Sequence, residues 1–329
     1  MGALAIIGAD HWHAPACASA LRNLGEQVVA VSASNLEAAR KVAGPLGARA
    51  YADWQELLAR ESVEFVFAYG VHREMTVIAR GLVEAGVAFV MEKPMGLDCQ
   101  ELASVAAAAE NKRLFAGPCL QMRCTALARA LLDLRAQGQL GRMICYFYRL
   151  FAGGPERYLA WGVPWMLDPA TAGSGPLFNF GPHVFDLFLL LSGEEPDTIY
   201  CRESRRLHGL DIPDQATVVL SSASGLIATV EVGYVCPETT YDEVFSICTD
   251  QLFVPTTTLK EGTVVFRDGR RLVVQTGALR PLEEFVRETL RRFRAGEAPL
   301  ARLGEMCRIL QLIGAATESA RRGTPVRLN

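Results

Sequence analysis

The sequence predicts an α/β protein of two domains, the first built on a parallel sheet and the second an α+β domain with a large open, mostly antiparallel sheet. Over the first third of the chain, short apolar runs alternate with helix-like segments, which is typical of a parallel sheet covered on both faces. Beyond residue 118 the strand-like runs are joined by turns too short for crossover helices, which indicates antiparallel neighbours. A chain of 329 residues, half of them hydrophobic, is also long for a single core.

The first domain is assigned to residues 1–118 and the second to residues 119–329. In the first domain, apolar runs predict strands at 4–7, 28–32, 65–69, 88–91 and 114–116, and the segments between them predict helices at 12–24, 36–46, 54–60, 73–85 and 99–112. In the second domain, the same reasoning predicts strands at 142–151, 198–205, 215–221, 226–235, 243–249, 263–267 and 271–275, and helices at 124–137, 281–294 and 303–322.

Charge and cysteine content narrow the function classes. A net charge of −3 gives no electrostatic basis for binding nucleic acid or an anionic membrane, so neither is expected as a partner. No apolar run reaches the roughly 18 residues that a spanning helix needs. The nine cysteines are scattered without a C-x-x-C pair, which favours reduced thiols in a cytoplasmic protein over a disulfide framework.

The stretch LAIIGADHWHAP, residues 4–15, has the order of a dinucleotide-binding turn: a buried strand, a sharp turn with Gly8, and a helix start. Asp10 and His13 stand where such a turn usually has its next two glycines. Aspartate is a favoured N-cap, and a carboxylate capping this helix would occupy the amides that normally receive phosphate. Pro15 suits the first helical turn, which places the helix start near residues 11–14, directly after Asp10.

Three interpretations of this loop stay open. In the first, which we favour, a dinucleotide binds slightly displaced and His11 or His13 donates to its phosphate. In the second, cofactor binding is weak or lost and the protein is a sensor or regulator. In the third, the two histidines and Asp10 form a metal site, but no further histidine or cysteine cluster supports it, and we expect no metal. Trp12 covers a ribose or packs between helix and sheet.

Two further stretches carry candidate chemistry. VMEKPMGLD, residues 90–98, directly follows an apolar strand, so Lys93 is expected at the carboxyl end of a parallel strand, where ligands bind in open α/β sheets. AGSGPLFNFGPHVFDLFLLLSG, residues 172–193, leads into a strongly apolar helix. In it Asn179, His183 and Asp186 recur at spacings of four and three and can share one helical face. On these residues alone, a structural role for the histidine is favoured over a catalytic one.

Together with ARRGTPVRL near the end of the chain, these motifs resemble the Gfo/Idh/MocA family, which includes glucose–fructose oxidoreductase and inositol dehydrogenase. The resemblance extends over nearly the whole chain. It implies an N-terminal Rossmann domain and NAD(P)-dependent oxidation or reduction at a carbinol carbon of a sugar, polyol or related small molecule. It also implies that the open C-terminal sheet forms a homodimer or homotetramer interface.

The same resemblance implies that Lys93 is the active-site lysine and His183 the acid/base histidine. Imidazole can exchange a hydroxyl proton near neutral pH, and an ammonium can stabilise negative charge on a substrate oxygen. The family usually has an aspartate four residues before the histidine. This chain has Asn179 there, which we expect to orient His183 by a hydrogen bond.

Other site residues are expected around this pair. Those expected at the cofactor are Gly8, Asp10, His11, Trp12, His13, Ser32, Ser34, Tyr69, His72, Glu92 and Lys93. Those expected at the substrate, each of which could equally be structural, are Arg123, Trp165 and Asp186.

The end of the second predicted strand bears on the choice between NAD(H) and NADP(H). An acidic residue at this point grips the adenosine ribose of NAD. Here Ala33 and Ser34 stand in its place, and the basic pair Arg40 and Lys41 follows, which favours NADP. The resemblance thus implies an NAD(P)(H)-dependent oxidoreductase acting on CH–OH groups. The alternatives are a non-catalytic sugar or dinucleotide sensor and a metal-dependent hydrolase using His11 and His13.

Overall fold

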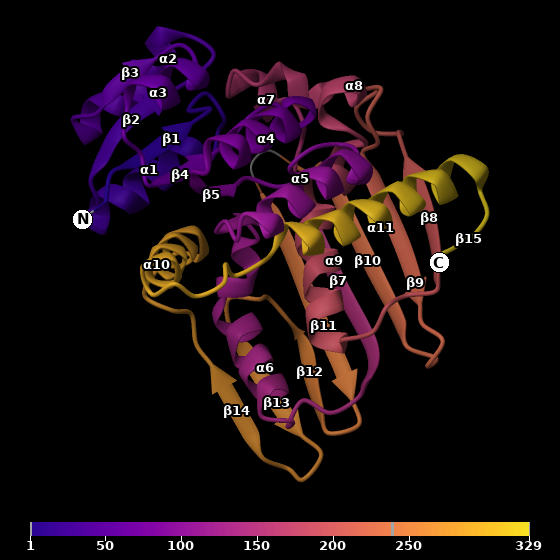
Figure 1. Cartoon of the computed structure of the whole chain (residues 1–329). Coiled ribbons are helices and arrows are strands. Elements are labelled where there is room, and N and C mark those ends of the chain that lie inside the picture. Colours follow the sequence, from indigo (N-terminus) through magenta and orange to yellow (C-terminus); the bar gives the residue numbers. More distant parts are fainter. Residues whose placement is uncertain (1, 238–239, 329) are drawn as a thin grey trace.

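The computed structural model describes residues 2–237 and 240–328, which form two sheets and the helices packed around them (Figure 1). The first sheet has six parallel strands in the order β3-β2-β1-β4-β5-β6. Its strands are β1 (Leu4–Ile7), β2 (Val28–Ser32), β3 (Arg49–Tyr51), β4 (Phe65–Ala68), β5 (Ala88–Met91) and β6 (Ala116–Pro118). The helices between them are α1 (Ala14–Asn23), α2 (Leu36–Ala43), α3 (Trp54–Arg60), α4 (Met75–Ala85) and α5 (Cys99–Asn111), with short 3-10 turns at Gly44–Leu46 and His72–Glu74.

The central strands of this sheet are apolar throughout because helices cover both of its faces. Every residue of β1, β4 and β5 is buried. The helices start at capping side chains: Asn35 accepts from the amide of Ala38 at 2.9 Å, and Asp53 accepts from that of Gln55 at 2.6 Å. This arrangement places the loops that follow β1, β2, β4 and β5 along one edge of the sheet.

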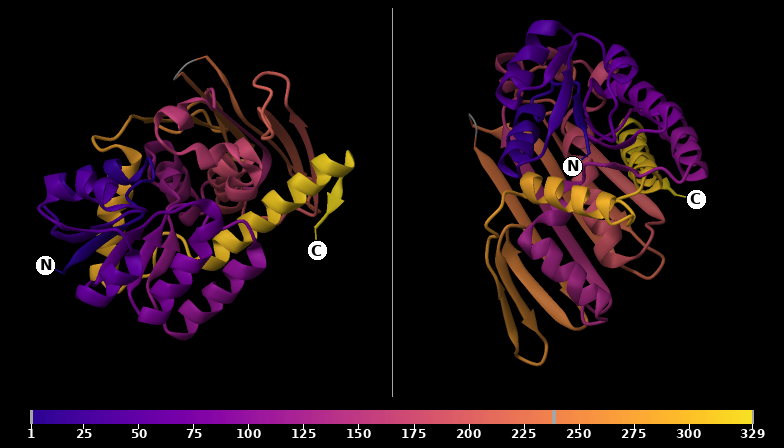
Figure 2. Two further views of the ribbon diagram at one scale, coloured as in Figure 1. Left: turned by 90° about the horizontal axis from the view of Figure 1, so that it is seen from above. Right: turned by 60° about the vertical axis from the view of Figure 1, so that its left-hand side comes forward.

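The second sheet has nine strands in the order β14-β13-β12-β11-β7-β10-β9-β8-β15, all antiparallel neighbours except β7 and β10. Its strands are β7 (Met143–Gly153), β8 (Thr198–Ser204), β9 (Gln215–Ser221), β10 (Ile227–Cys236), β11 (Tyr241–Thr249), β12 (Leu252–Thr257), β13 (Gly262–Phe266), β14 (Arg271–Val274) and β15 (Val326–Arg327). The helices α6 (Ala126–Ala136), α9 (Gly175–Ser192) and α11 (Leu303–Arg322) pack on one face, and the other face is left open (Figure 2). Short helices lie at Gln121–Cys124, α7 (Arg157–Ala160), Pro164–Leu167 and α8 (Pro169–Ala172).

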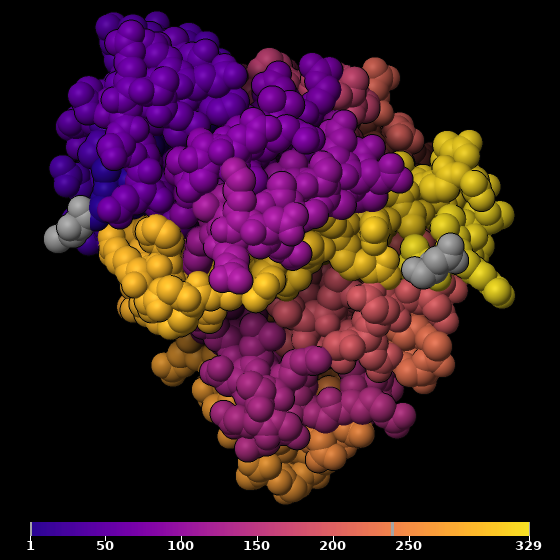
Figure 3. Space-filling view, viewed as in Figure 1, coloured from indigo at the N-terminus to yellow at the C-terminus, as the bar shows by residue number. Residues whose placement is uncertain are grey.

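The end of the chain returns to the first domain and fastens the two sheets together. Helix α10 (Pro281–Arg294) packs against α1, where Phe285 and Val286 join the core of the parallel sheet. Helix α11 then runs between α5 and the second sheet. Figure 3 shows α10 and α11, in orange and yellow, lying against the surface formed by the N-terminal part of the chain.

The predicted fold class is confirmed, with a parallel sheet followed by an open, mostly antiparallel one. Three strands were not predicted. Strands β3 and β15 have three and two residues, too few to show a period. Strand β12 contains Pro255, which breaks the strand pattern and lies near a shift in the pairing with β11. None of the helices in the described ranges is long and apolar enough to cross a membrane.

Candidate active site

A cavity of about 250 Å³ lies where the carboxyl edge of the parallel sheet meets α9 and strand β7. The loop after β1 contributes Trp12 and His13, and the loop after β5 contributes Lys93. The second domain contributes, among others, Arg157 and Tyr158 from α7 and Asn179 and His183 from α9. The structure therefore brings Lys93 and His183, ninety positions apart in the chain, to one cavity between the two domains.

Lys93 is held by acceptors on helix α9. Its Nζ donates to the main-chain oxygen and to the side-chain Oδ1 of Asn179, each at 2.7 Å, and lies 3.6 Å from Oε1 of Glu92. Burial lowers the pKa of the Lys93 ammonium, and the Glu92 carboxylate opposes that shift. Only 3% of the Lys93 side chain is exposed, so its ammonium is held by these protein acceptors.

Glu92 is a buried carboxylate that faces His13 as well as Lys93. Its Oε2 lies 3.2 Å from Nδ1 of His13, and 1% of its side chain is exposed. Burial by itself raises the pKa of the Glu92 carboxyl, but His13 and Lys93 outweigh burial and hold this pKa well below its ordinary value.

His183 lines the same cavity, but the prediction that Asn179 orients it by a hydrogen bond is wrong. The amide oxygen of Asn179 accepts from Lys93, and its nitrogen donates to the hydroxyl of Tyr158 at 2.8 Å. Asn179 therefore positions Lys93 and not His183, whose buried Nδ1 has no hydrogen-bond partner among the described residues. Burial, and after it the charge of Lys93, lowers the pKa of His183 to about 3, so the imidazole is neutral at pH 7.

The sequence analysis did not identify the wall formed by helix α7. The hydroxyl of Tyr158 lies 3.3 Å from that of Tyr234, and the guanidinium of Arg157 lies over both rings, 4.8 and 5.0 Å from their centroids. Trp161 completes this wall. The segment PERYLAW that carries α7 has two aromatic residues and an arginine within five positions, which is the signal that could have indicated a ligand-facing element.

The loop after β1 differs from its expected form. Helix α1 begins at Ala14 with His13 as the N-cap residue, and Asp10 does not cap it. Asp10 instead directs Oδ1 toward the amide of Ser34, 3.4 Å away at the end of β2. The amide of His13 donates to Nδ1 of His11 at 3.2 Å, that of Ala14 donates to the His11 carbonyl at 3.0 Å, and Pro15 has none. Three successive positions at this helix start therefore offer no amide to a phosphate.

His11, His72 and Trp165 are packed between the domains and line neither cavity described here. His11 is 3% exposed and stacks on Trp12 with 3.8 Å between the ring centroids. His72 is fully buried, donates from Nδ1 to the carbonyl of Ala172 at 2.9 Å, and meets the ring of Trp165 edge-on at 5.0 Å. Trp12 in turn contacts Tyr158 of α7, with 5.5 Å between the centroids. These rings join the loop after β1 to the second domain.

Arg123 and Asp186, which the sequence analysis expected at the substrate, do not line this cavity. Arg123 donates from Nε and Nη2 to both oxygens of Asp186, at 2.8 and 2.5 Å, and from Nη2 to Glu305 at 2.7 Å. Both members of the pair are more than nine-tenths buried and lie outside the cavity lining. Asp186 shares a helical face with His183, as predicted, but it points to the ion pair that joins α9 to α11.

A second cavity, of about 390 Å³, lies on the other side of the β1 loop, at the carboxyl ends of β1, β2 and β4. Gly8, at φ +75°, closes its floor, and a Cβ added there would come within 2.4 Å of the Tyr69 carbonyl. Ser32, Ser34 and Asp10 lie around it, as does Tyr69. Because dinucleotides bind across this edge of a Rossmann sheet, the two cavities fit the two ends of such a cofactor, with the β1 loop between them.

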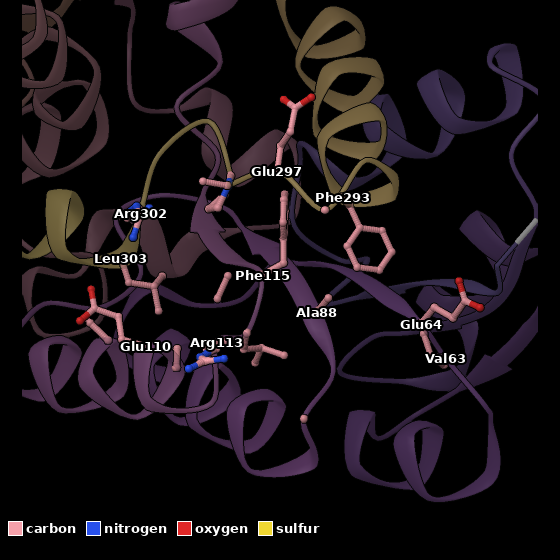
Figure 4. A pocket seen from close by; sticks show the side chains of 18 residues that line it. Val63, Glu64, Ala88, Glu110, Arg113, Phe115, Phe293, Glu297, Arg302 and Leu303 are labelled. Carbon is pink, nitrogen blue, oxygen red and sulfur yellow. The ribbon is translucent and has the colours of Figure 1, made fainter.

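A larger cavity of about 900 Å³ lies at the amino ends of β4, β5 and β6, opposite the site (Figure 4). Phe115 and Phe293 meet edge-on there with 5.6 Å between their centroids, among small side chains such as Ala88. Ligands of parallel sheets bind at the carboxyl ends of the strands, so we do not assign the reaction to this cavity. Among the described residues, no three His, Cys, Asp or Glu side chains are grouped to hold a metal ion.

Two family models match this chain in succession. The model described as an oxidoreductase family with an NAD-binding Rossmann fold matches residues 3–117, and the model of the GFO/IDH/MocA C-terminal domain matches residues 128–251. The chain belongs to the Gfo/Idh/MocA family. The resemblance seen in its motifs is thereby confirmed, and an NAD-binding Rossmann domain is established for its N-terminal third.

Relatives of this Gfo/Idh/MocA protein include dehydrogenases. A trans-1,2-dihydrobenzene-1,2-diol dehydrogenase of Oryctolagus cuniculus is 30% identical over 209 residues, which are 63% of this chain and 61% of that protein. The chain thus matches about three fifths of the length of the first relatives. The D-xylose 1-dehydrogenase (NADP(+)) 2 of Haloferax volcanii is 27% identical over 92% of this chain and 93% of its own.

Solved structures share the whole fold of this Gfo/Idh/MocA chain at low identity. A levoglucosan dehydrogenase in complex with NADH and levoglucosan has a TM-score of 0.87 at 18% identity, and the match covers 99% of this chain and 98% of that one. An oxidoreductase from Agrobacterium radiobacter in complex with NAD+, L-tartaric acid and magnesium has a TM-score of 0.84 at 18% identity, over 99% and 98% of the two chains.

Proposed function

We propose that this protein is an NAD(P)(H)-dependent dehydrogenase that transfers hydride to or from a carbinol carbon of a sugar, polyol or related small molecule. The observation that carries the proposal is the meeting of Lys93 and His183 at one cavity between the domains. Membership of an oxidoreductase family and the dehydrogenases among its relatives support it. The cavity is small and lined with polar groups and aromatic rings, which suits a compact hydroxylated substrate.

Lys93 and His183 have different roles in the reaction. A bound nicotinamide supplies the site that accepts or returns the hydride. His183 is neutral at pH 7 and is therefore free to accept the proton of the substrate hydroxyl. Lys93 exchanges one of its acceptors for the substrate oxygen and stabilises the negative charge that develops there. Asn179 is a positioning residue, because it fixes the ammonium through two of its own atoms.

A non-catalytic sensor remains the second candidate, and one observation favours it. The amides at residues 13–15 are occupied or missing, so the helix start offers less to a pyrophosphate than a glycine-rich turn does. A sensor of this kind binds a sugar or dinucleotide without turnover.

We also propose that the protein is cytoplasmic and that two copies associate through the open face of the second sheet. All nine cysteines are free thiols in the structure, which suits a reducing compartment. Val219, Ile227 and Phe253 are exposed on that face, by 37, 54 and 43%. Exposed apolar side chains on one sheet face are a usual mark of an interface.

The test combines binding and turnover. The wild-type chain should bind NADH or NADPH in a fluorescence titration and oxidise a member of a polyol and aldose panel. His183→Ala should keep the cofactor affinity within about twofold but lose roughly 10²-fold or more in kcat. Cofactor binding without turnover on any substrate would favour the sensor, and failure to bind either nucleotide would contradict the proposed function.

A further inference from the structure

We propose that Asp10 makes this protein selective for NAD(H) over NADP(H), by standing in for the acidic residue that Rossmann domains usually carry at the end of their second strand. This inference rests on the proposed function, because it concerns the cofactor of the same site. It reverses the preference for NADP that the sequence around Ser34 predicts.

The position of the carboxylate follows from the sheet. Strands β1 and β2 are parallel neighbours, so the loops that leave their carboxyl ends lie side by side. Asp10 is three residues beyond the end of β1, and its Oδ1 lies 3.4 Å from the amide of Ser34, two residues beyond the end of β2. The side chain thus lies over the strand end from which an NAD-specific acid normally projects. The Asp10 carboxylate reaches this position from the loop after β1, not from β2 itself.

The strand end itself, residues 32–35, carries no acidic side chain. Ser32 is 1% exposed, and Ala33 has no polar atom. Asn35 uses Oδ1 to cap α2. Asp53, the other aspartate around this cavity, uses Oδ1 to cap α3 at 2.6 Å. Of the two aspartates, Asp10 is the one directed to the end of β2.

The charges around the cavity oppose a 2′-phosphate. Its described lining includes three carboxylates, those of Asp10, Asp53 and Glu74, and no lysine or arginine. Of the basic residues that favoured NADP in the sequence, Lys41 is paired with Glu37 at 3.1 Å and Arg40 lies in the last turn of α2, away from the lining.

The chemistry distinguishes the two nucleotides by charge. A carboxylate accepts hydrogen bonds from the vicinal hydroxyls of a ribose, so the adenosine ribose of NAD(H) can donate to Asp10. A 2′-phosphate carries nearly two negative charges, has no hydroxyl to donate from that position, and is repelled at short range. The geometry points to discrimination of about tenfold or more in favour of NADH, since tenfold needs only a small difference in electrostatic free energy.

The experiment measures dissociation constants of NADH and NADPH in parallel on the full chain, by quenching of tryptophan fluorescence. Wild-type protein should bind NADH at least about tenfold more tightly than NADPH. Asp10→Asn should weaken the binding of NADH, strengthen the binding of NADPH, and bring the two dissociation constants within about threefold of each other. Asp10→Gly combined with Ser34→Asp should restore the preference, because it returns the acid to the end of β2.

Glu84→Gln is the control, because it removes one exposed carboxylate from α4 at a position outside the lining of this cavity. It should leave the NADH preference within about twofold of wild type. Equal affinity of the wild type for both nucleotides, or an unchanged ratio in Asp10→Asn, would overturn the role of Asp10 alone. Failure of the wild type to bind either nucleotide would instead overturn the proposed function, and this inference with it.

Discussion

At the scale of single residues, the site is a set of buried polar groups that hold one another. Lys93 lies between Asn179 and Glu92, and Glu92 faces His13 from its other oxygen. The neighbouring histidines are kept neutral: burial is the first cause that lowers the pKa of His183 and His72, each to about 3, and of His11. At neutral pH the Glu92 carboxylate therefore lies beside Lys93, near three histidine rings that burial keeps neutral.

This state predicts that acid unfolds the protein through its histidines. Each neutral histidine titrates near pH 6.5 when unfolded but only near pH 3 in the folded chain for His72 and His183. Between these values the unfolded state binds more protons, so the free energy of unfolding falls as pH falls, by up to about 1.4 kcal/mol per pH unit for each such residue.

Urea unfolding measured at pH 7, 6, 5 and 4 checks this prediction. His72→Gln removes one titrating ring from the interface between the domains. The slope of its free energy of unfolding against pH should be smaller than that of wild type by about 1 kcal/mol per pH unit. Equal slopes in the two proteins would show that His72 becomes protonated in the folded state.

At the scale of elements, α9 connects the chemistry to the rest of the molecule. One face of its N-terminal half presents Asn179 and His183 to the cavity, and Asp186 pairs with Arg123 and so ties α9 to α11 through Glu305. An ion pair of this kind contributes mainly by fixing the helices in one arrangement, because the cost of removing both charges from water offsets most of the attraction.

Asp186→Ala should lower the free energy of unfolding by about 3 kcal/mol or more, because it leaves the Arg123 guanidinium buried with only the half-exposed Glu305 as a charged partner. The double variant Arg123→Met with Asp186→Leu should recover most of this loss. Glu37→Ala, which breaks the exposed pair with Lys41, is the control and should change stability by less than about 0.5 kcal/mol. Chemical denaturation measures all three, and a small effect in Asp186→Ala would contradict the account.

Much of the secondary structure follows from the sequence because its signals are local. The predicted strands at 4–7, 28–32 and 88–91 and the predicted helix at 303–322 have the bounds that the structure shows, since apolar runs end there at turn residues. Strand β12 was not predicted because it contains Pro255, and proline is normally absent from central strands.

The partners of the site residues could not be predicted in the same way, because they depend on how distant elements pack. Spacing within α9 indicates that Asn179 and His183 share a face, but whether the amide meets the histidine or Lys93 is decided by where the loop after β5 crosses the helix. The pairing of Arg123 with Asp186, and of Asp10 with the amide of Ser34, depends likewise on contacts between separate elements.

At the scale of the whole molecule, the two sheets have different surroundings. The parallel sheet is covered on both faces, whereas the nine-stranded sheet has helices on one face and the exposed Val219, Ile227 and Phe253 on the other. These side chains lie on neighbouring or nearby strands and give that face an apolar character that a second copy can cover.

Ile227→Lys should therefore convert an oligomer into a monomer, because it places a charge within the proposed interface. Light scattering coupled to size-exclusion chromatography measures the change. Val77→Lys, at a 63% exposed valine on α4 of the first domain, is the control and should leave the mass unchanged. A monomeric wild-type protein would contradict the interface.

The central claim is that one dinucleotide lies across the β1 loop, with its adenosine beside Asp10 and its nicotinamide beside Lys93 and His183. A crystal structure of the protein with NADH tests this most directly. The account predicts that the nicotinamide C4 lies in the cavity with His183, at a distance that leaves a substrate carbon about 3 to 3.5 Å from it. A nicotinamide outside that cavity, or facing away from both side chains, would contradict it.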